Sequence, residues 1–215
     1  MNYLNFHNFQ LLLKLNISMI PVSRRKPSEE LLACRLSVVS GQSYGYAAPG
    51  ITRRGIMPPG YDHDNNRCRL GRGEACFRLA KDLLDTWRMF PASWTQIHGP
   101  DRPVVGTEVV VVFRFFDLWW QNACRVVYRI DTHAAYGFAY GTLLDHVERG
   151  EELFVVEMDA TGVVWFRIEA VSRPNRWYVR LGYPFARAGQ RRFVRDSFAQ
   201  MQGLVQHELQ ATDHG

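Results

Sequence analysis

The sequence is short of the features that mark several protein classes. Its four cysteines form no CxxC pair and show no spacing typical of metal ligands, which argues against a zinc centre or a redox motif. Cys76 and Cys124 fall on apolar faces, so we expect buried thiols in a reducing cytoplasm. The formal net charge is +5 and is spread along the chain, so we expect no nucleic-acid partner.

No long uninterrupted apolar run is present either. Residues 1–20 are apolar, but Lys14 interrupts them and no basic residue precedes them, unlike in a secretory signal. A membrane-spanning helix needs about 20 apolar residues, which this segment does not supply. Three interpretations stay open: an added helix, a weak membrane-surface segment, or translation from an upstream start with Met19 as the natural one.

The chain has the length and composition of a folded domain. It has 215 residues, of which 47% are apolar and 13% aromatic. We expect an N-terminal extension over residues 1–40, partly disordered or helical, in which Ser28 is a candidate helix N-cap. A single domain should occupy residues 41–209. It opens with a glycine- and proline-rich connector, residues 41–61, which is expected to lack helix and strand through most of its length.

A short strand at residues 67–70 is expected to precede the first helix of this domain. Gly71-Arg-Gly-Glu74 opens the helix, and Pro91 ends it. The two glycines either cradle a phosphate at the helix N-terminus or form a turn and cap. One apolar stripe at steps of four and three residues supports the helix: Cys76, Ala80, Leu83, Trp87 and Phe90.

Strands follow in close succession. The apolar and polar residues alternate over residues 108–115, 124–131, 136–142, 152–158 and 163–172. The last two segments flank Asp159-Ala-Thr-Gly162, a hairpin turn. Because the connections are short, the sheet should be antiparallel. Gly137, Ala139 and Gly141 form a face of small residues, which leaves space or permits bending and close backbone approach.

The last helix carries two stripes. An apolar stripe, which needs a surface to pack on, consists of Val194, Phe198, Met201 and Val205. Arg187, Arg191 and Arg195 form the second stripe at steps of four residues. This arginine stripe either attracts an anionic partner or membrane surface, or is an ordinary solvated face.

The order of elements is strand, helix, five or so antiparallel strands and a long helix. This order predicts the α+β class, and it resembles the START-like, helix-grip (SRPBCC) superfamily, in which a curved antiparallel sheet grips a long C-terminal helix. Short motifs between Pro58 and Pro174 strengthen the resemblance: PPGY, LGRGEACF, WRMF, NACRVVY, GFAYGTL, HVERGEE, VWF and SRP. In this order they are similar to an uncharacterised family, the domain of unknown function nineteen-ninety, over about residues 40 to 203. The resemblance implies the fold but no activity and no cofactor.

Residues 137–174 hold the densest group of titratable side chains. They predict three strands and two tight turns, and the first turn carries His146 with three carboxylates, those of Glu148, Glu151 and Glu152. A histidine beside carboxylates can act as a general acid or base, so His146, Glu148 and Glu152 are the catalytic candidates. Metal binding through nitrogen and carboxylate is conceivable, and a solvated turn is the simpler alternative.

A second group of residues suggests a ligand pocket. Phe113, Tyr140 and Trp165 could line an apolar wall of the cup. Polar residues that could fix a ligand head are Asn122, Arg125 and Arg173. The alternative is equally open: the two arginines make structural ion pairs with the turn carboxylates, and the aromatic residues are plain core.

Three functions follow from these patterns. The first is a domain that binds an apolar or amphipathic small molecule, or a lipid-like one, between sheet and terminal helix. The second is a cyclase- or hydrolase-type enzyme that uses His146 or Glu148 with an arginine. The third is an adaptor that contacts an anionic surface through the arginine stripe. Val110, Val112 and Phe116 are a candidate homodimer patch on the outer face.

Overall fold

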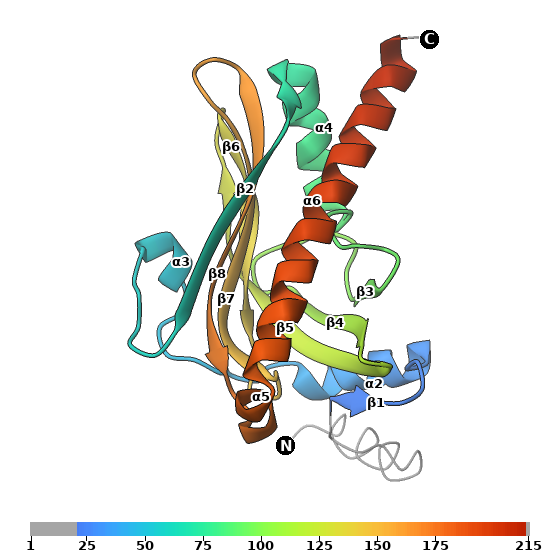
Figure 1. Ribbon diagram of the computed structural model, residues 1–215, viewed down its shortest axis with the longest axis vertical. Helices are drawn as coiled ribbons and strands as arrows, with labels where there is room; N and C mark the ends of the chain where they lie inside the picture. Colours follow the sequence, from blue (N-terminus) through green and yellow to red (C-terminus); the bar gives the residue numbers. More distant parts are fainter. Residues whose placement is uncertain (1–20, 214–215) are drawn as a thin grey trace.

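A curved antiparallel sheet and a long C-terminal helix dominate the computed structural model, which describes residues 21–213 (Figure 1). The sheet wraps around one side of the helix, which crosses it diagonally. The α+β class and the gripping of the terminal helix are therefore confirmed. The expectations about residues 1–20 lie outside the described residues.

Every strand pairs antiparallel with its neighbours, in the order β2-β8-β7-β6-β5-β4-β3, and β1 pairs with β5. The short connections predicted from sequence account for this pattern, because antiparallel neighbours need only a tight turn between them. The strands are β1 (Val22–Ser23), β2 (Asp62–Arg72), β3 (Thr95–His98), β4 (Glu108–Phe115), β5 (Leu118–Asp131), β6 (Ala135–Thr142), β7 (Glu148–Met158) and β8 (Val163–Pro174).

The helices lie on both faces of the sheet. Figure 1 shows α4 and α6 on the inner, concave side and α2 and α3 outside it. The helices are α2 (Glu29–Val39), α3 (Ile51–Arg54), α4 (Gly73–Asp85), α5 (Trp177–Leu181) and α6 (Tyr183–Asp213). None of the described helices is long and apolar enough to cross a membrane.

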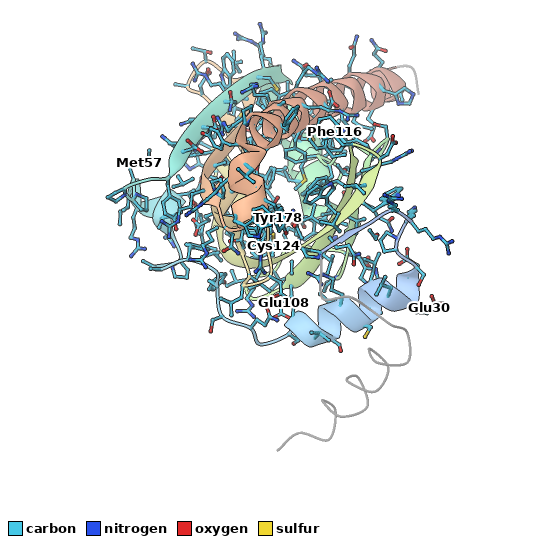
Figure 2. All side chains as sticks on the ribbon, turned by 60° about the horizontal axis from the view of Figure 1, so that its bottom comes forward. Glu30, Met57, Glu108, Phe116, Cys124 and Tyr178 are labelled. Carbon is cyan, nitrogen blue, oxygen red and sulfur yellow. The ribbon has the colours of Figure 1, made fainter. Side chains whose placement is uncertain are left out.

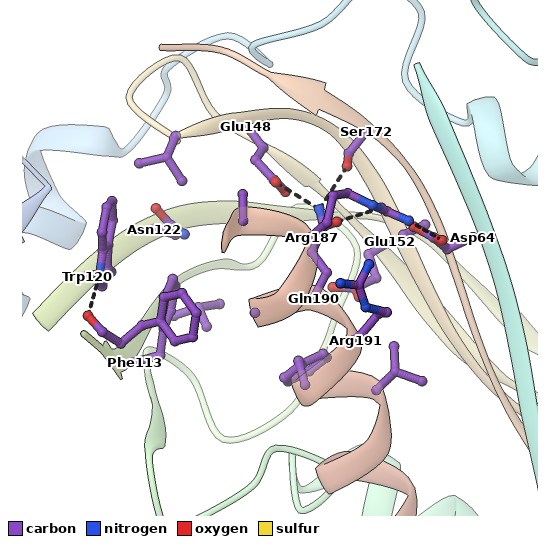
Figure 3. A pocket seen from close by; sticks show the side chains of 18 of the residues that line it. Asp64, Phe113, Trp120, Asn122, Glu148, Glu152, Ser172, Arg187, Gln190 and Arg191 are labelled. Carbon is purple, nitrogen blue, oxygen red and sulfur yellow. Dashed lines mark hydrogen bonds and ion pairs between the residues drawn. The ribbon is translucent and has the colours of Figure 1, made fainter. Parts of the chain in front are cut away.

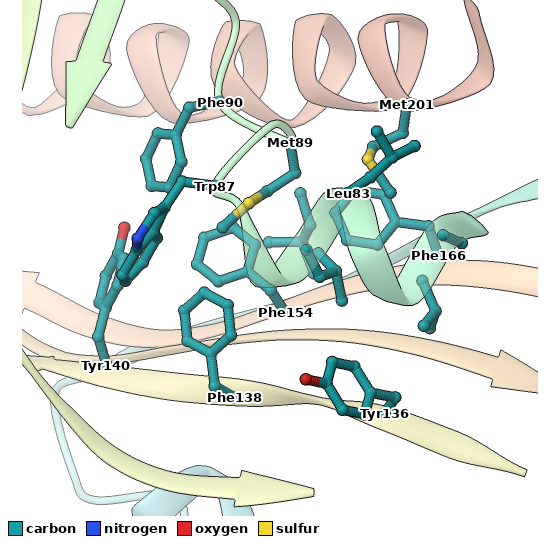
Figure 4. Packing of buried hydrophobic residues seen from close by; sticks show 14 of the residues in the cluster. Leu83, Trp87, Met89, Phe90, Tyr136, Phe138, Tyr140, Phe154, Phe166 and Met201 are labelled. Atoms are coloured by element: carbon teal, nitrogen blue, oxygen red, sulfur yellow. The ribbon is translucent and has the colours of Figure 1, made fainter. Parts of the chain in front are cut away.

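The main core fills one end of the space between sheet and helices (Figure 4). Leu83 of α4 and Met201 of α6 are fully buried there against the sheet residues Phe154 and Phe166. Each such buried side chain contributes roughly 1.5–3 kcal/mol of transfer free energy. Both apolar stripes predicted from sequence therefore pack on the concave face. Cys76 and Cys124 are buried free thiols, as expected.

Several element boundaries differ from the sequence predictions. Strands β2, β5 and β7 begin at Asp62, Leu118 and Glu148, earlier than residues 67, 124 and 152. These starts carry polar or bulky residues on both sides, so alternation of apolar and polar residues does not mark them. The short strands β1 and β3 were not predicted at all.

The first helix ends earlier than predicted. Helix α4 stops at Asp85, and Trp87 has a left-handed backbone with φ of 59°. The apolar stripe nevertheless reaches Phe90, because the turns after the helix direct Trp87 and Phe90 into the core. The rings of Trp87 and Phe138 lie 4.9 Å apart, edge to face. The buried Trp87 and Phe90 therefore continue the four-and-three spacing of the apolar stripe, although they lie beyond the end of the helix.

Helix α2 covers part of the outer face. Its N-cap is Ser28, as predicted, whose hydroxyl oxygen accepts a hydrogen bond from the Leu31 N–H at 3.3 Å. Leu32 packs on Val110 and Val112, and all three are fully buried. The expectation that Val110 and Val112 form an exposed dimer patch is therefore wrong. The homodimer itself and the domain division at residue 40 stay predictions.

The connector before β2 is held to the outer face by a buried carboxylate. Glu151 is 2% exposed and accepts hydrogen bonds from the Tyr46 hydroxyl at 2.7 Å and the backbone N–H groups of Gly50 and Thr52 at 2.7 and 3.1 Å. Apart from the short α3, the connector has no helix or strand, as predicted. These bonds replace the regular structure that the segment lacks.

The small residues of β6 allow neighbouring groups to pack closely against this strand on the outer face of the sheet. A Cβ atom at Gly141 would overlap the Tyr46 ring, and one at Gly137 would overlap the backbone of Phe154 on β7. The sequence left two interpretations of this face, open space or close backbone approach with bending, and the structure shows the close approach. The bulky residues Phe138 and Tyr140 point to the concave side instead.

Replacing Gly137 tests this close packing. In Gly137→Ala, the new Cβ would lie 2.7 Å from the Val155 Cα, so β6 and β7 must separate. We expect a loss of about 3 kcal/mol in unfolding free energy, measured by urea denaturation. The matched control is Gly203→Ala on α6, where the Cβ meets no atom within 4 Å and should stabilise the helix by about 0.5–1 kcal/mol. Equal midpoints for the two variants would contradict this account.

Candidate functional site

A cavity of about 930 Å³ lies between the concave face of the sheet and the first part of α6 (Figure 3). Gly182, which directly precedes α6, and Ala186 and Gly189 of α6 follow one another at steps of four and three residues and line it, beside larger residues of the helix such as Phe185 and Phe193. A run of small side chains on one helix face leaves space that the larger residues of the C-terminal part fill with core. The division of α6 into these two parts creates the cavity.

One wall of the cavity is aromatic. The rings of Phe113 on β4 and Trp120 on β5 stack with centroids 6.1 Å apart and planes 5° apart. Trp94 packs edge to face on both Phe113 and Phe193. Other apolar lining residues include Phe90, Val111, Phe115, Tyr140, Ile168, Val194 and Phe198. Rigid rings of this kind give a large contact area to an apolar ligand.

The opposite wall carries two carboxylates of β7. Glu148 and Glu152 are four residues apart on a strand, so both point to the concave side. Gln190 donates a hydrogen bond to Glu148 Oε1 at 2.8 Å, and the Tyr140 hydroxyl donates one to Glu152 Oε2 at 2.7 Å. The start of β7 at Glu148 thus places both groups in the cavity rather than in a solvated turn.

Burial raises the pKa of both carboxyl groups. The pKa of Glu152 is raised from 4.5 to about 7, first by burial and then by the negative charge of Glu148, while the Tyr140 hydrogen bond opposes the rise. Burial also raises the pKa of Glu148, against the hydrogen bond from Gln190 and the positive charge of Arg187. Near neutral pH the Glu152 carboxyl is therefore partly protonated.

An ion pair on the cavity's rim holds Gln190 in place. Arg187 donates two hydrogen bonds to Asp64 at 2.5 and 2.6 Å, and a further one to Gln190 Oε1 at 2.6 Å. The chain of contacts runs from Asp64 through Arg187 and Gln190 to Glu148 (Figure 3). Asp64 therefore neutralises the charge of Arg187 and fixes the orientation of its guanidinium group.

Asn122 lies on β5 between the aromatic wall and the carboxylates (Figure 3). Its side chain is 5% exposed, and the amide oxygen has no hydrogen-bond partner among the described residues. Leaving a buried acceptor unpaired costs about 1–3 kcal/mol. Such a group in a cavity wall is one that a bound molecule can satisfy.

His146 also lines the cavity but has a different role from the one predicted. Its Nδ1 accepts a hydrogen bond from the Glu148 N–H at 2.9 Å. Burial, and secondarily the positive charge of Arg35, lower its pKa to about 3, so the imidazole stays neutral. Its one lone-pair nitrogen is engaged by the backbone, which leaves none free to take a proton from a ligand. This geometry fixes the turn before β7.

Three of the residues predicted to contact a ligand do not line the cavity, namely Arg125, Trp165 and Arg173. Arg125 faces the outer side, where it forms an ion pair with Glu108 at 2.5 Å. The Trp165 indole N–H donates to Asp159, and the ring stacks under Arg67 on the outer side. Arg173 lies over the Tyr61 ring. The alternative prediction, that Arg125 makes a structural ion pair, agrees with this contact, but its partner is Glu108 and not a carboxylate of the turn.

Phe113, Asn122, Tyr140, His146, Glu148 and Glu152 do meet around one cavity. Sequence reasoning missed Asp64, Gln190 and the small face of α6, although the steps of four and three from Gly182 were a readable signal. In the arginine stripe, Arg187 pairs with Asp64 and Arg195 with Asp196, and Arg191 makes no ion pair with another described residue. Among residues 21–213, no cluster of His, Cys, Asp and Glu side chains could hold a metal ion.

The mouth of the cavity is marked by exposed aromatic residues. Phe116 at the β4–β5 turn is 63% exposed, and Phe185 at the start of α6 is 59% exposed. Their rings lie edge to face, 5.4 Å apart. Phe116 and Asp117 both have left-handed backbones, with φ of 50° and 55°, the conformation of a tight hairpin turn. Figure 2, in which the bottom of Figure 1 comes forward, labels Phe116 and also Tyr178, which lines the cavity as well.

Comparisons with known proteins identify a family and several relatives that match most of this chain. A family model described as Domain of unknown function (DUF1990) matches residues 45–200. A UPF0548 protein of Deinococcus radiodurans is 34% identical over 182 residues, which cover 80% of this chain and 92% of that protein. A UPF0548 protein of Dictyostelium discoideum is 34% identical over 154 residues, 66% of this chain and 71% of that protein. Neither name states an activity.

Among solved structures, Ara h 8.0201 is similar with a TM-score of 0.48 and 12% sequence identity. The match covers 69% of this chain and 99% of that one.

The raised pKa of Glu152 predicts how stability changes with pH. Between its ordinary 4.5 and the folded value of about 7, the folded protein binds a proton that the unfolded chain has lost, so stability falls as the pH rises through this interval. Glu152→Gln mimics the protonated form. It should match the wild type near pH 4 and exceed it by about 2 kcal/mol near pH 8, in denaturant titrations. A constant difference between the two proteins over this interval would contradict the assignment.

Proposed function

Since this chain belongs to the DUF1990 family, a family of domains of unknown function, we propose its function from the cavity: it binds an amphipathic small molecule between the sheet and α6. The apolar body of the ligand lies against the wall of Phe113 and Trp120. Its polar end lies toward Glu148, Glu152 and Asn122.

The observation that carries this proposal is the cavity itself. Its volume of about 930 Å³ falls in the range of small-molecule sites, which are mainly apolar with a few placed polar groups. A solid core at this position would have argued for a purely structural domain. Covering apolar surface of a ligand yields roughly 25 cal/mol for each Å² removed from water, which is enough to hold a lipid-sized molecule.

A cyclase- or hydrolase-type enzyme is the second candidate, and Glu152 is the observation that favours it. A carboxyl group with a pKa of about 7 in a closed site can donate or accept a proton at neutral pH. The Tyr140 hydroxyl at 2.7 Å orients it. In this version Glu152, with Glu148 beside it, takes the role that sequence reasoning gave to His146. Conversion of a bound molecule by the wild type but not by Glu152→Gln, followed by mass spectrometry, would support it.

The remaining functional expectations gain no support from the site. The adaptor hypothesis relied on three free arginines, two of which are paired with aspartates. It stays a prediction, as do the cytoplasmic location and the homodimer.

Filling the cavity tests the binding function. Ala186 lines the cavity, whereas Ala199 on the same helix is exposed. With N-phenyl-1-naphthylamine as a neutral fluorescent probe, we expect Ala186→Phe to weaken binding by at least about tenfold, since the new ring occupies the probe's space. The matched control Ala199→Phe should bind as the wild type does. Equal binding by both variants, or none by the wild type, would refute the proposed function.

A further inference from the structure

We propose that the cavity selects ligands whose polar end is a cation, with Glu148 and Glu152 as its receptors and a protonated amine as the fitting group. This selectivity rests on the proposed binding function and adds the chemical class of the ligand.

Each of the two carboxylates keeps one oxygen available. Gln190 uses Glu148 Oε1 and Tyr140 uses Glu152 Oε2. Among the described residues, no donor reaches Glu148 Oε2 or Glu152 Oε1, although both residues line the cavity. A carboxylate oxygen that lines a cavity without a donor is a strong acceptor site for a charged N–H group. An ammonium group has three N–H donors and no acceptor, which suits a wall of acceptors.

The charges around the pair do not neutralise it. Glu148 faces Arg187, but both terminal nitrogens of that guanidinium donate to the Asp64 carboxylate, and Asp62 adds a further negative charge. Glu152 faces the Tyr140 hydroxyl together with the negative charges of Glu148 and Asp64. The other cavity-lining arginines, Arg191 and Arg195, are exposed, and Arg195 is paired with Asp196. Among the described residues, therefore, no cationic side chain forms an ion pair with Glu148 or Glu152.

Asn122 supplies an independent sign of a missing partner. Its amide oxygen is buried and unpaired, and it lies between the carboxylates and the aromatic wall. A donor on the ligand, next to its cationic end, would satisfy this oxygen. The three groups together define a gradient from acceptors at one end of the cavity to aromatic rings at the other, which matches an amine with an apolar or aromatic body.

A proton leaves when such a ligand binds. Glu152, with a pKa of about 7, is partly protonated near neutral pH, and an ammonium placed beside it favours the ionised carboxylate. Binding of a cation at neutral pH should therefore release protons to the buffer. A carboxylate ligand would be repelled or would have to take up a proton, and an alcohol would change the protonation little.

Decylamine, decanol and decanoate have apolar chains of nine or ten carbons and differ mainly at the polar end, so displacement of N-phenyl-1-naphthylamine by each measures the selectivity directly. We expect decylamine to bind roughly 30-fold more tightly than decanoate at neutral pH. Calorimetry of decylamine binding in two buffers of different ionisation enthalpy should show proton release.

Charge-neutral variants locate the selectivity. In the double variant Glu148→Gln/Glu152→Gln the preference for decylamine should disappear, while the probe still binds. The matched control is Glu157→Gln, on the same strand but facing outward to Arg167, and it should keep the preference. If the double variant fails to fold, Glu152→Gln alone should reduce both the preference and the proton release.

The outcomes separate the two proposals. If the wild type binds the probe but decanoate displaces it as well as decylamine does, the cation selectivity is overturned and the binding function stands. If the preference survives in the double variant, the assignment to these carboxylates is overturned. If neither the probe nor decylamine binds the wild type, in displacement or in calorimetry, both proposals fail.

Discussion

The alternation of side chains along β7 is the constraint on which both faces of the molecule depend. Glu151 points outward, where the Tyr46 hydroxyl and the backbone N–H groups of Gly50 and Thr52 bind it and hold the connector to the sheet. Its neighbours Glu148 and Glu152 point inward to a cavity with few donors. A shift of one residue in register would exchange these environments and leave the connector without its anchor. Strand β7 thus places the structural carboxylate of Glu151 on one face of the sheet and the cavity-lining carboxylates of Glu148 and Glu152 on the other.

Helix α6 divides the concave space in a similar way. Its C-terminal part carries large residues such as Met201 and Val205, which pack into the core with α4. Its first part carries the small residues Ala186 and Gly189, which line the cavity. The aromatic residues opposite stay ordered by packing on one another, as the stacked Phe113 and Trp120 do. The aromatic wall of the cavity is therefore supported by contacts among its own rings.

The sequence was sufficient for the class, the antiparallel order and most of the site, because these follow from short-range patterns. Alternation identified β4, β6 and β8, and helical spacing identified the core stripe of α6. It failed where a feature depends on distant partners. Arg125 and Glu108 meet across two strands, and Asp64 meets Arg187 across the whole domain, so no local spacing reports either pair. His146 was a catalytic candidate with a solvated turn as the alternative, whereas folding buries it and engages its Nδ1 in a backbone hydrogen bond.

Native mass spectrometry of the purified wild type and Ala186→Phe, produced side by side, tests the central claim most directly. A cavity that binds a small molecule predicts a discrete added mass on the wild type, released on denaturation and absent from the variant whose cavity is filled. Apo masses for both proteins, or the same added mass on both, would contradict a ligand site between the sheet and α6.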